Sequence, residues 1–558
     1  MKKYLSLSIL LLLLWGPFIT LTAQDQNNFE LSKNIEIYID VLRQLNDNYA
    51  DDIKPGELNK ISIDAMLRSL DPYTVYVPES KLEDFELMTK GEYGGIGALI
   101  QKQGDYVVIT EPYEGFPAEK AGLKAGDKII AINGEPAKDK ASRAVSDKLK
   151  GIPGTSLTLT IQSYGDTTSH QVEVVREKVK IPNVPYYGML KNNIGYINLS
   201  QFNPNAANDV KKAFSELNEN KQLNGIVLDL RGNGGGLLSE AVDIVNLFVP
   251  KGTTVVTTKG KNPENIQVHR TRYSPVDTKI PLVVLVNGNS ASASEIVAGS
   301  IQDLDRGVII GERTFGKGLV QNIVPLPYNS KMKMTIAKYY IPSGRCIQAI
   351  DYFTQNADGG HDKIPDSLIS EFKTAHGRSV YDGKGINPDI KIKPTVFSQV
   401  TADLYTQNYF FNYANEFALK NPEIAPAGDF VITDETFNNF KEFVTNQHFD
   451  YKTETESLIE RINKSAEREG YLNAIQPVLD SLSADVRKEK LKDIDKNRHQ
   501  IEEVLRVEIV THYYYQKGKV IAALKNDPAI DKTVKIISDP ELYHSILKGT
   551  YIQKETGK

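Results

Sequence analysis

The chain has 558 residues, of which 40% are hydrophobic and 25% are charged. This composition is ordinary for a folded globular protein, and the length is sufficient for three or four domains. The 66 basic and 71 acidic residues leave a formal net charge of −5, which gives no reason to expect nucleic acid as a partner. Because Cys346 is the only cysteine, an intramolecular disulfide and a cysteine-based zinc cluster are excluded, and we expect no metal or cofactor.

The first residues have the features of a secretory signal peptide. Two lysines precede the apolar run Leu5–Leu14, and the small residues of Thr20–Ala23 come before Gln24. The apolar run is shorter than the roughly 20 residues that a membrane span needs, which disfavours the alternative of an uncleaved anchor. We therefore expect residues 1–23 to be removed and the mature chain to be exported, either into the periplasm or in association with the inner membrane.

Two regions of different character follow the signal segment. Residues 24–88 are predicted to be helical, because apolar side chains recur at helical spacing from Ile35 to Leu45, and a second short helix is predicted over 78–88. Residues 89–178 contain short strand-like runs separated by turns. The pair Asn133-Gly134 is a strong hairpin signal, and these features together predict a small β-rich module over 89–178.

The remaining two regions form the larger part of the chain. Over residues 179–400 buried strands alternate with helices, as where the apolar run 225–230 precedes a helix predicted over 239–248, and this alternation indicates an α/β core. Within it, the polar segment 351–382 is predicted to be a surface insertion. Residues 401–558 are charged, amphipathic and predicted to be helical. The expected fold class is therefore α/β and multidomain, with helical regions at both ends.

A serine at the end of a buried strand is the first candidate for chemistry. The strand 281–286 ends in the turn Asn287-Gly-Asn289, and Ser292 follows where a helix should begin. The spacing Ser292-Ala-Ser-Glu295 also fits a capping box, which alone would be the better interpretation. The exposed turn and a lysine bracketed by glycines in the same α/β unit favour catalysis instead, because a serine needs a base to become a nucleophile.

That lysine is Lys317, in the segment Thr314-Phe-Gly-Lys-Gly318. A free lysine has a pKa near 10.4, so it can act as a base only if desolvation lowers that pKa by several units. The neighbours Phe315 and Leu319 could form the apolar wall that this requires. Gln321 follows closely enough to orient the amine. The alternatives are a solvated loop lysine and an ordinary strand glutamine.

Other candidate bases and acids are less favourable. None of the eight histidines lies in a turn with small residues and an acid, and His269 is the only one within the central stretch of the core. Asp303 lies 11 residues after Ser292 on the same predicted helix, which is about three full turns and roughly 16 Å along its axis. We therefore expect Asp303 to pair with Arg306 or to shape the helix end rather than to touch the serine.

A glycine-rich loop ends another predicted strand, at Asp229-Leu-Arg231-Gly-Asn-Gly-Gly-Gly236. It lacks the Gly-Lys-Ser/Thr ending of a phosphate loop, and its glycine spacing misses the dinucleotide fingerprint. Glycines allow a backbone to approach a substrate closely, and ligands in α/β sheets tend to bind at this end of the strands. The N–H groups of Gly235 and Ala293 are thus candidates for an oxyanion hole; the alternative is a tight turn without a ligand.

The β-rich module has a glycine loop of its own, formed by Gly94, Gly95, Ile96 and Gly97. Backbone N–H groups of such a loop can bind the carboxylate of a peptide C-terminus, and the peptide then adds as a strand beside the loop. A plain turn between strands is the alternative interpretation.

Taken together, these segments resemble the C-terminal processing peptidases, also called tail-specific proteases. The resemblance extends over roughly residues 60–393. It is carried by Leu70-Asp-Pro72, the PDZ-like module at 89–178, Leu228-Asp-Leu-Arg231 with its glycines, Ser290-Ala-Ser-Ala-Ser-Glu-Ile296, Thr314-Phe-Gly-Lys-Gly318, Tyr339-Tyr-Ile-Pro-Ser-Gly344 and Gly385-Ile-Asn-Pro-Asp389. Each segment is weak evidence alone, whereas the combination is highly specific.

The resemblance implies an exported serine endopeptidase with a ClpP/crotonase-like α/β core and a Ser–Lys dyad. By motif position, Ser292 is the nucleophile, Lys317 the base and Gln321 the orienting residue. The resemblance also implies a PDZ domain that binds the free C-terminal tail of a protein or peptide substrate and can gate the active site. In place of the family's frequent Asn-Pro, the loop has Gly232-Asn-Gly234, which leaves the oxyanion donor open by one residue.

Two other functions remain as alternatives. A non-catalytic PDZ adaptor would bind carboxyl tails and use the α/β core as a scaffold, although the presence of Ser292, Lys317 and Gln321 argues against it. A crotonase-type acyl-CoA enzyme would use the same glycine turns for thioesters, but the signal peptide disfavours intracellular CoA chemistry. The helical flanks suggest a homodimer, and the insertion at 351–382 and the C-terminal region suggest an enzyme that depends on an adaptor protein.

Overall fold

The computed structural model describes residues 27–82, 85, 91–220, 222–356 and 360–553. The chain forms two compact units, one of residues 1–78 with 323–334 and one of residues 79–322 with 335–558. The signal segment expected at 1–23 lies outside the described residues. Of the helix expected over 78–88, residues 83, 84 and 86–88 lie outside the described residues too, and its described part includes a 3-10 turn at Glu79–Lys81.

The first unit is mostly helical. It contains a helix at residues 27–48 and α2 (Pro55–Arg68), and the phenol of Tyr38 donates to Oδ1 of Asn59 over 2.9 Å to join the two. The short strand β1 (Val75–Val77) pairs antiparallel with residues 331–333 of the same unit. The helical character predicted for this part of the chain is therefore present where the structure describes it.

The β-rich module of the second unit is a small sheet with two helices. Its strand order is β3-β4-β5-β7-β8, with β6 paired to β5. At the predicted hairpin Asn133 and Gly134 have φ of 51° and 79°, as the tight turn between β5 and β6 requires. The elements are β3 (Ala98–Gln103), β4 (Tyr106–Pro112), α4 (Pro117–Lys120), β5 (Lys128–Ile132), β6 (Glu135–Pro136), α5 (Ser142–Leu149), β7 (Ser156–Gln162) and β8 (His170–Val175).

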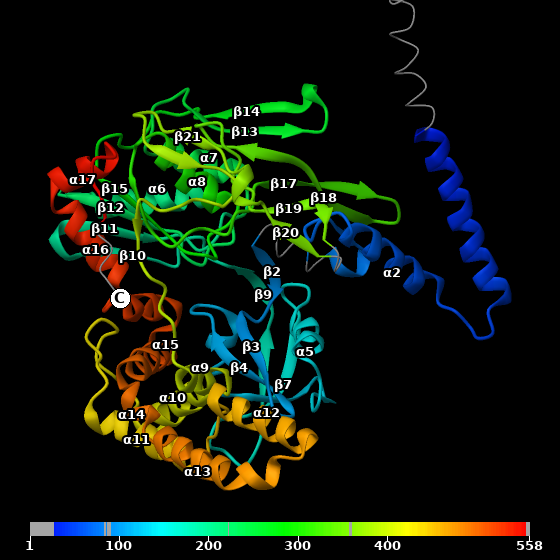
Figure 1. The fold of residues 1–558 in the computed structure, drawn as a ribbon, viewed down its shortest axis with the longest axis vertical. Helices are drawn as coiled ribbons and strands as arrows, with labels where there is room; N and C mark the ends of the chain where they lie inside the picture. The colour runs from blue at the N-terminus through cyan, green and yellow to red at the C-terminus, as the bar shows by residue number, and fades with distance from the viewer. Residues whose placement is uncertain (1–26, 83–84, 86–90, 221, 357–359, 554–558) are drawn as a thin grey trace, which may run out of the picture. The chain divides into compact units, whose positions relative to one another are not determined.

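The α/β core contains a six-stranded sheet in the order β10-β11-β12-β15-β16-β23. Figure 1 labels four of these strands, β10, β11, β12 and β15. The strands β11, β12, β15, β16 and β23 run parallel to one another, and β10 is antiparallel at one edge of the sheet. The α/β class predicted from the sequence is thus confirmed. The strands are β10 (Tyr186–Leu190), β11 (Ile194–Asn198), β12 (Gly225–Asp229), β15 (Leu282–Val286), β16 (Val308–Gly311) and β23 (Ile390–Lys391).

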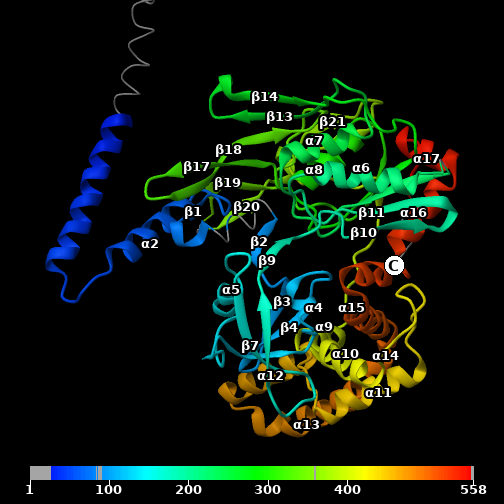
Figure 2. The ribbon, with the colours of Figure 1, turned by 180° about the vertical axis from the view of Figure 1, so that it is seen from behind.

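The central strand β15 is buried on both faces. Leu282, Val284 and Val286 belong to a cluster with helices α6 (Ala206–Leu217), α7 (Leu238–Asn246) and α8 (Ala293–Asp303). Val283 and Leu285 belong to a second cluster, which is completed by α16 (Pro528–Ile537) and α17 (Pro540–Leu547) from the end of the chain (Figure 2). The last helices of the predicted C-terminal region therefore form part of the core.

The chain also forms a second sheet and a set of short strands. The second sheet has the order β1-β18-β13-β14, with β17 paired to β18. The elements beyond it are short hairpins, one formed by β19 and β20 and another by β21 and β22. The bounds are β13 (Thr254–Gly260), β14 (Ile266–Arg270), β17 (Leu319–Leu326), β18 (Ser330–Tyr340), β19 (Ile350–Gln355), β20 (His361–Lys363), β21 (Glu371–Lys373) and β22 (Ser379–Tyr381).

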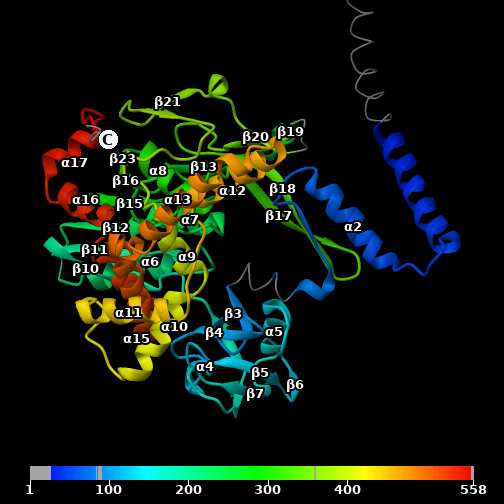
Figure 3. The same ribbon diagram turned by 60° about the horizontal axis from the view of Figure 1, so that its bottom comes forward.

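The C-terminal region is helical, as predicted. Its long helix α15 (Arg498–Leu524) is interrupted at Tyr515, whose φ of 51° and ψ of −154° are not helical. Figure 3 shows α12 and α13 side by side as a helical hairpin. No helix among the described residues has the length and apolarity of a bilayer span. The other helices are α9 (Gln399–Thr406), α10 (Tyr409–Lys420), α11 (Asp434–Asn446), α12 (Glu454–Glu469), α13 (Leu472–Lys490) and α14 (Asp493–Lys496).

One partly buried histidine of this region, His512, lies between two oxygen atoms. Nδ1 of His512 lies 2.9 Å from the carbonyl oxygen of Glu508, and Nε2 lies 3.0 Å from Oδ1 of Asn415. Burial lowers the pKa of His512 to about 4, although the carbonyl of Glu508 acts in the opposite direction. The imidazole is consequently neutral in the folded protein under conditions where the unfolded chain already takes up a proton.

We predict that this histidine weakens the fold between pH 6.5 and pH 4. The pKa of His512 is lower in the folded protein than in the unfolded chain. Its contribution to the free energy of unfolding is therefore fully present above pH 6.5 and decreases as the pH falls toward 4, by up to about 3 kcal/mol. Urea unfolding of His512→Gln should show a correspondingly smaller loss of stability over that interval. His499→Gln, at an exposed position on the same helix, is the control. An unchanged pH dependence in His512→Gln would contradict the prediction.

Candidate active site

Ser292 stands at the junction between the strand-end turn and helix α8. Its φ of 56° and ψ of −114° lie in a region that residues with a Cβ rarely adopt. The turn before it is held from both sides, since Oγ of Ser290 donates to the carbonyl of Leu230 over 2.8 Å and accepts from the N–H of Asn287 over 3.0 Å. The chain is thus forced through a strained conformation at the serine that sequence analysis identified as the nucleophile.

The buried carboxylate of Glu295 joins the serine segment to the lysine segment. Its Oε2 accepts from the N–H of Ser292 over 2.8 Å and from the N–H of Lys317 over 2.9 Å. Its Oε1 accepts from the hydroxyl of Thr314 over 2.6 Å and from the N–H of Gly316 over 2.8 Å. Burial raises the pKa of Glu295, and these four hydrogen bonds counter the shift. Because one oxygen atom binds both backbones, the structure brings Ser292 and Lys317 together.

Tyr339 makes a second connection between the same two residues. Its ring is buried, with 1% of the residue exposed, and its hydroxyl lies 3.2 Å from the carbonyl oxygen of Ser292. The same hydroxyl donates to the carbonyl oxygen of Lys317. Glu295 therefore holds the N–H groups of the two residues, and Tyr339 lies against their carbonyl groups.

The surroundings of Lys317 differ on its two sides. Leu319 is buried, whereas Phe315 is 48% exposed, so the apolar wall predicted from these two residues exists only on the side of Leu319. Lys317 itself is half-buried. Gln321, two residues into β17, donates from Nε2 to Oγ1 of Thr335 over 3.2 Å. The orienting role expected for Gln321 thus remains a prediction.

The glycine loop touches the serine directly. A Cβ atom at Gly235 would lie 2.8 Å from Cβ of Ser292 and 3.0 Å from the backbone nitrogen of Ala293, which is why only glycine fits there. In this structure the N–H of Gly235 donates to Oδ1 of the buried Asn233 over 2.9 Å. The structure thus brings both predicted oxyanion donors beside Ser292, and for Gly235 to bind an oxyanion this hydrogen bond must be shared or broken.

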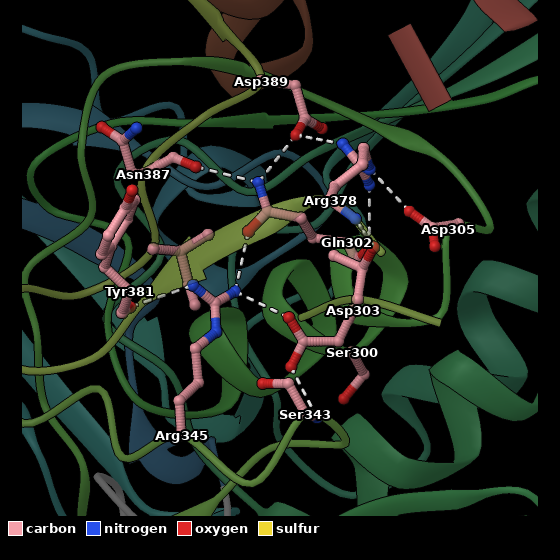
Figure 4. A network of polar contacts seen from close by, with 12 residues as sticks. Ser300, Gln302, Asp303, Asp305, Ser343, Arg345, Arg378, Tyr381, Asn387 and Asp389 are labelled. Carbon is pink, nitrogen blue, oxygen red and sulfur yellow. Dashed lines mark hydrogen bonds and ion pairs between the residues drawn. The ribbon is translucent and has the colours of Figure 1, made fainter. Parts of the chain in front are cut away.

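Asp303, the acid that sequence analysis set aside, lies at the other end of α8. Its Oδ1 accepts from Nη2 of Arg345 over 2.8 Å, and both side chains are buried (Figure 4). The predicted pairing of Asp303 with Arg306 is wrong, because the guanidinium of Arg306 donates instead to backbone carbonyls. Asp303 is the last residue of α8, and the role expected for it in shaping the helix end remains a prediction.

The sequence predicts a surface insertion over 351–382, but this segment is also hydrogen-bonded to the core. Its residue Arg378 donates to the carboxylates of Asp305 and Asp389, each over 2.6 Å, and to the carbonyl oxygen of Gln302 over 2.9 Å (Figure 4). The segment is therefore joined to the end of the helix that begins at Ser292.

The glycine loop of the β-rich module packs against the end of α5. A Cβ at Gly94 would lie 2.0 Å from the carbonyl oxygen of Gly151, and Gly94 and Gly95 belong to β2 (Glu92–Gly95). The carbonyl oxygens of Ile96 and Gly97 accept hydrogen bonds from elsewhere in the module, over 2.7 and 2.8 Å. The loop thus lies between β2, β3 and α5, and its use in binding peptides remains a prediction.

Three family models match the chain. They are "Peptidase family S41" over residues 193–354, "PDZ domain" over 86–162 and "Probable PDZ-protease, C-terminal helical domain" over 400–537. A carboxy-terminal-processing protease of Bartonella bacilliformis is 36% identical over 332 residues, which are 59% of this chain and 75% of that protein. The chain belongs to peptidase family S41.

Other proteins are similar to the chain over different extents. A probable CtpA-like serine protease of Staphylococcus aureus is 35% identical over 329 residues, or 59% of this chain and 64% of that protein. Among solved structures, the photosystem II D1 C-terminal processing protease is 29% identical, with a TM-score of 0.36, and the match covers 64% of this chain and 87% of that one. The PDZ domain of a Vibrio cholerae carboxy-terminal protease, solved with a peptide, is 31% identical over 16% of this chain and 99% of its own, with a TM-score of 0.16.

Sequence reasoning missed part of the candidate site. The capping-box spacing identified Glu295 as a helix cap, but its bonds to Thr314, Gly316 and Lys317 depend on a loop that follows about 20 residues later. The sequence contains no indication that Tyr339 belongs to the site, other than its position in the segment Tyr339-Tyr-Ile-Pro-Ser-Gly344. The described residues hold no group of three or more His, Cys, Asp or Glu side chains arranged for a metal ion.

The conformation of Ser292 leads to a prediction about stability. A non-glycine residue at such φ and ψ costs on the order of 1–3 kcal/mol, part of which glycine gives back through its larger unfolded-state entropy. Ser292→Gly should therefore be more stable than Ser292→Ala by about 1 kcal/mol in chemical denaturation, although both lack the hydroxyl. If Ser292→Gly were equally stable or less stable, the backbone at this position would not be strained.

Proposed function

We propose that the protein is an exported serine endopeptidase that processes the C-terminal region of its substrates. In this proposal Ser292 is the nucleophile and Lys317 the general base. The observation that carries it is the sharing of Oε2 of Glu295 by the backbone N–H groups of Ser292 and Lys317. The S41 family membership and the name of the Bartonella relative support the same reaction class.

The proposed reaction proceeds through an acyl-enzyme. Lys317, as a neutral amine oriented by Gln321, takes the proton from Oγ of Ser292, which attacks the scissile carbonyl. The N–H groups of Gly235 and Ala293 stabilise the negative charge on the tetrahedral oxygen. Lys317 then gives the proton to the leaving amine, and the acyl-enzyme is hydrolysed by water.

Substrate selection is assigned to the PDZ domain. The N–H groups of the segment Gly94, Gly95, Ile96 and Gly97 bind the terminal carboxylate, and the tail adds as a strand along β3. Support comes from the match of residues 86–162 to the PDZ family. The partners are then proteins or peptides with a free C-terminus.

Export, dimerisation and an adaptor complete the proposal. The signal features of residues 1–23 support export to the periplasm or to the inner membrane, and a mature N-terminus at Gln24 would verify cleavage. On the helix at 27–48, Ile35 and Ile39 are 51% and 50% exposed, which suits a homodimer contact and would be excluded by a monomeric mass in light scattering. An adaptor protein that delivers substrates is part of the same hypothesis.

We predict that Lys317→Ala abolishes cleavage while the fold persists. The substrate is an unfolded reporter with an apolar C-terminus, prepared as the free acid and as the amide, and followed by electrophoresis. Wild type should cleave the free acid faster, because only the free carboxylate binds the PDZ loop. Lys317→Arg should be equally inactive, since a guanidinium keeps its proton at all working pH values.

Two results would change the assignment. Near-wild-type cleavage by Lys317→Ala would remove the lysine from the mechanism. If wild type binds the free-acid tail without cleaving it, the PDZ adaptor becomes the better description.

A further inference from the structure

An ion pair joins the C-terminal region to the residue that precedes the glycine loop. Oδ2 of Asp527 lies 2.6 Å from Nη1 of Arg231, the last residue before the glycine loop. Oδ1 of Asp527 caps helix α16, where it accepts from the N–H of Ala529 over 2.8 Å. The cap therefore uses one carboxylate oxygen, and the second is directed at the arginine.

Arg231 lies in a fixed environment at the start of the loop. Its Nε lies 3.0 Å from each oxygen of the buried Asp229, and its own N–H donates to Oδ1 of Asp229 over 2.9 Å. Asp229 in turn accepts from the hydroxyl of Tyr196 over 2.7 Å. Burial lowers the pKa of Arg231, but the carboxylates of Asp229 and Asp527 outweigh that effect and raise it. The arginine is thus held between two carboxylates from distant parts of the chain.

The loop that follows Arg231 is connected to the nucleophile. The N–H of Gly232 donates to Oδ1 of Asn287 over 2.9 Å, and Asn233 accepts the N–H of Ala291 at its carbonyl oxygen over 3.1 Å. Gly235 then lies against Ser292. A displacement of Arg231 is accordingly passed to a loop whose glycine must be placed accurately beside Ser292.

We propose that Asp527 is a positioning residue of the active site. It fixes Arg231 from the side of the C-terminal helices and so sets the position of the glycine loop that stabilises the oxyanion. This inference rests on the proposed function, because it assumes that the loop acts on the tetrahedral intermediate. It makes the C-terminal helical domain a contributor to turnover rather than only a cover for the sheet.

The chain offers a matched control for this proposal. Asp539 stands before Pro540 as Asp527 stands before Pro528, and it caps α17 by accepting the N–H of Leu542 over 3.0 Å. In the described part of the chain, no ion pair to Asp539 is found. Serine is itself a good N-cap, so Asp527→Ser and Asp539→Ser both preserve the cap, but only the first removes the partner of Arg231.

The test compares steady-state cleavage of the free-acid reporter by wild type, Ser292→Ala and the two serine variants of the caps. We expect Asp527→Ser to lower kcat about 10-fold with KM unchanged, less than the 10²–10³-fold that loss of an oxyanion donor costs. Asp539→Ser should match wild type in both constants. The variant Asp527→Asn keeps the shape of the side chain and removes its charge, so its kcat should lie between those of the two serine variants. If circular dichroism shows that Asp527→Ser does not fold, Asp527→Asn replaces it in the comparison.

Failure of this proposal is distinguishable from failure of the proposed function. Absence of Ser292-dependent cleavage in wild type would overturn the proposed function and this inference with it. Cleavage by wild type together with equal kcat values for the Asp527 and Asp539 variants would overturn the inference alone. A rise in KM at unchanged kcat would also overturn it, because it would place Asp527 in substrate binding.

Discussion

The architecture depends on the burial of a parallel sheet from both sides. All five residues of β15 are buried, and its alternate side chains enter two different hydrophobic clusters. A parallel strand of this kind is stable only when helices cover both faces. The helices between the strands cover one face, and α16 and α17, more than 200 residues further along the chain, cover the other. The end of the chain is therefore necessary for the core on which the active site is built.

This arrangement also determines where the chemistry is located. In a parallel sheet the carboxyl ends of neighbouring strands meet at one edge, and β12 and β15 end there in the glycine loop and in the turn that leads to Ser292. Glu295 then stabilises the site with a carboxylate that is completely buried and receives four hydrogen bonds. Such a group is costly to bury unless it is fully hydrogen-bonded, so the backbone of the lysine loop has little freedom to move away.

The sequence predicted the features that depend on local pattern. The α/β class and the hairpin at Asn133-Gly134 follow from short-range periodicity and turn chemistry. The approach of the glycine loop to Ser292 was expected because both segments follow the carboxyl ends of strands in the α/β core. The apolar run of β15 predicted a buried strand, but it could not identify α16 and α17 as the cover of one face. Long-range side-chain partners were equally inaccessible, since Asp303 pairs with Arg345 rather than Arg306. No local pattern connects Asp527 to Arg231, which is almost 300 residues earlier.

The central claim is that Ser292 forms a covalent acyl-enzyme with the help of Lys317. Its most direct test is an acid quench of wild type during cleavage of a free-acid peptide, followed by mass spectrometry of the intact protein and of its digest. The account predicts an added mass equal to that of the N-terminal fragment of the substrate less one water, located on Ser292, and no such adduct in Lys317→Ala. An adduct on another residue, or cleavage that persists in Ser292→Ala, would contradict it.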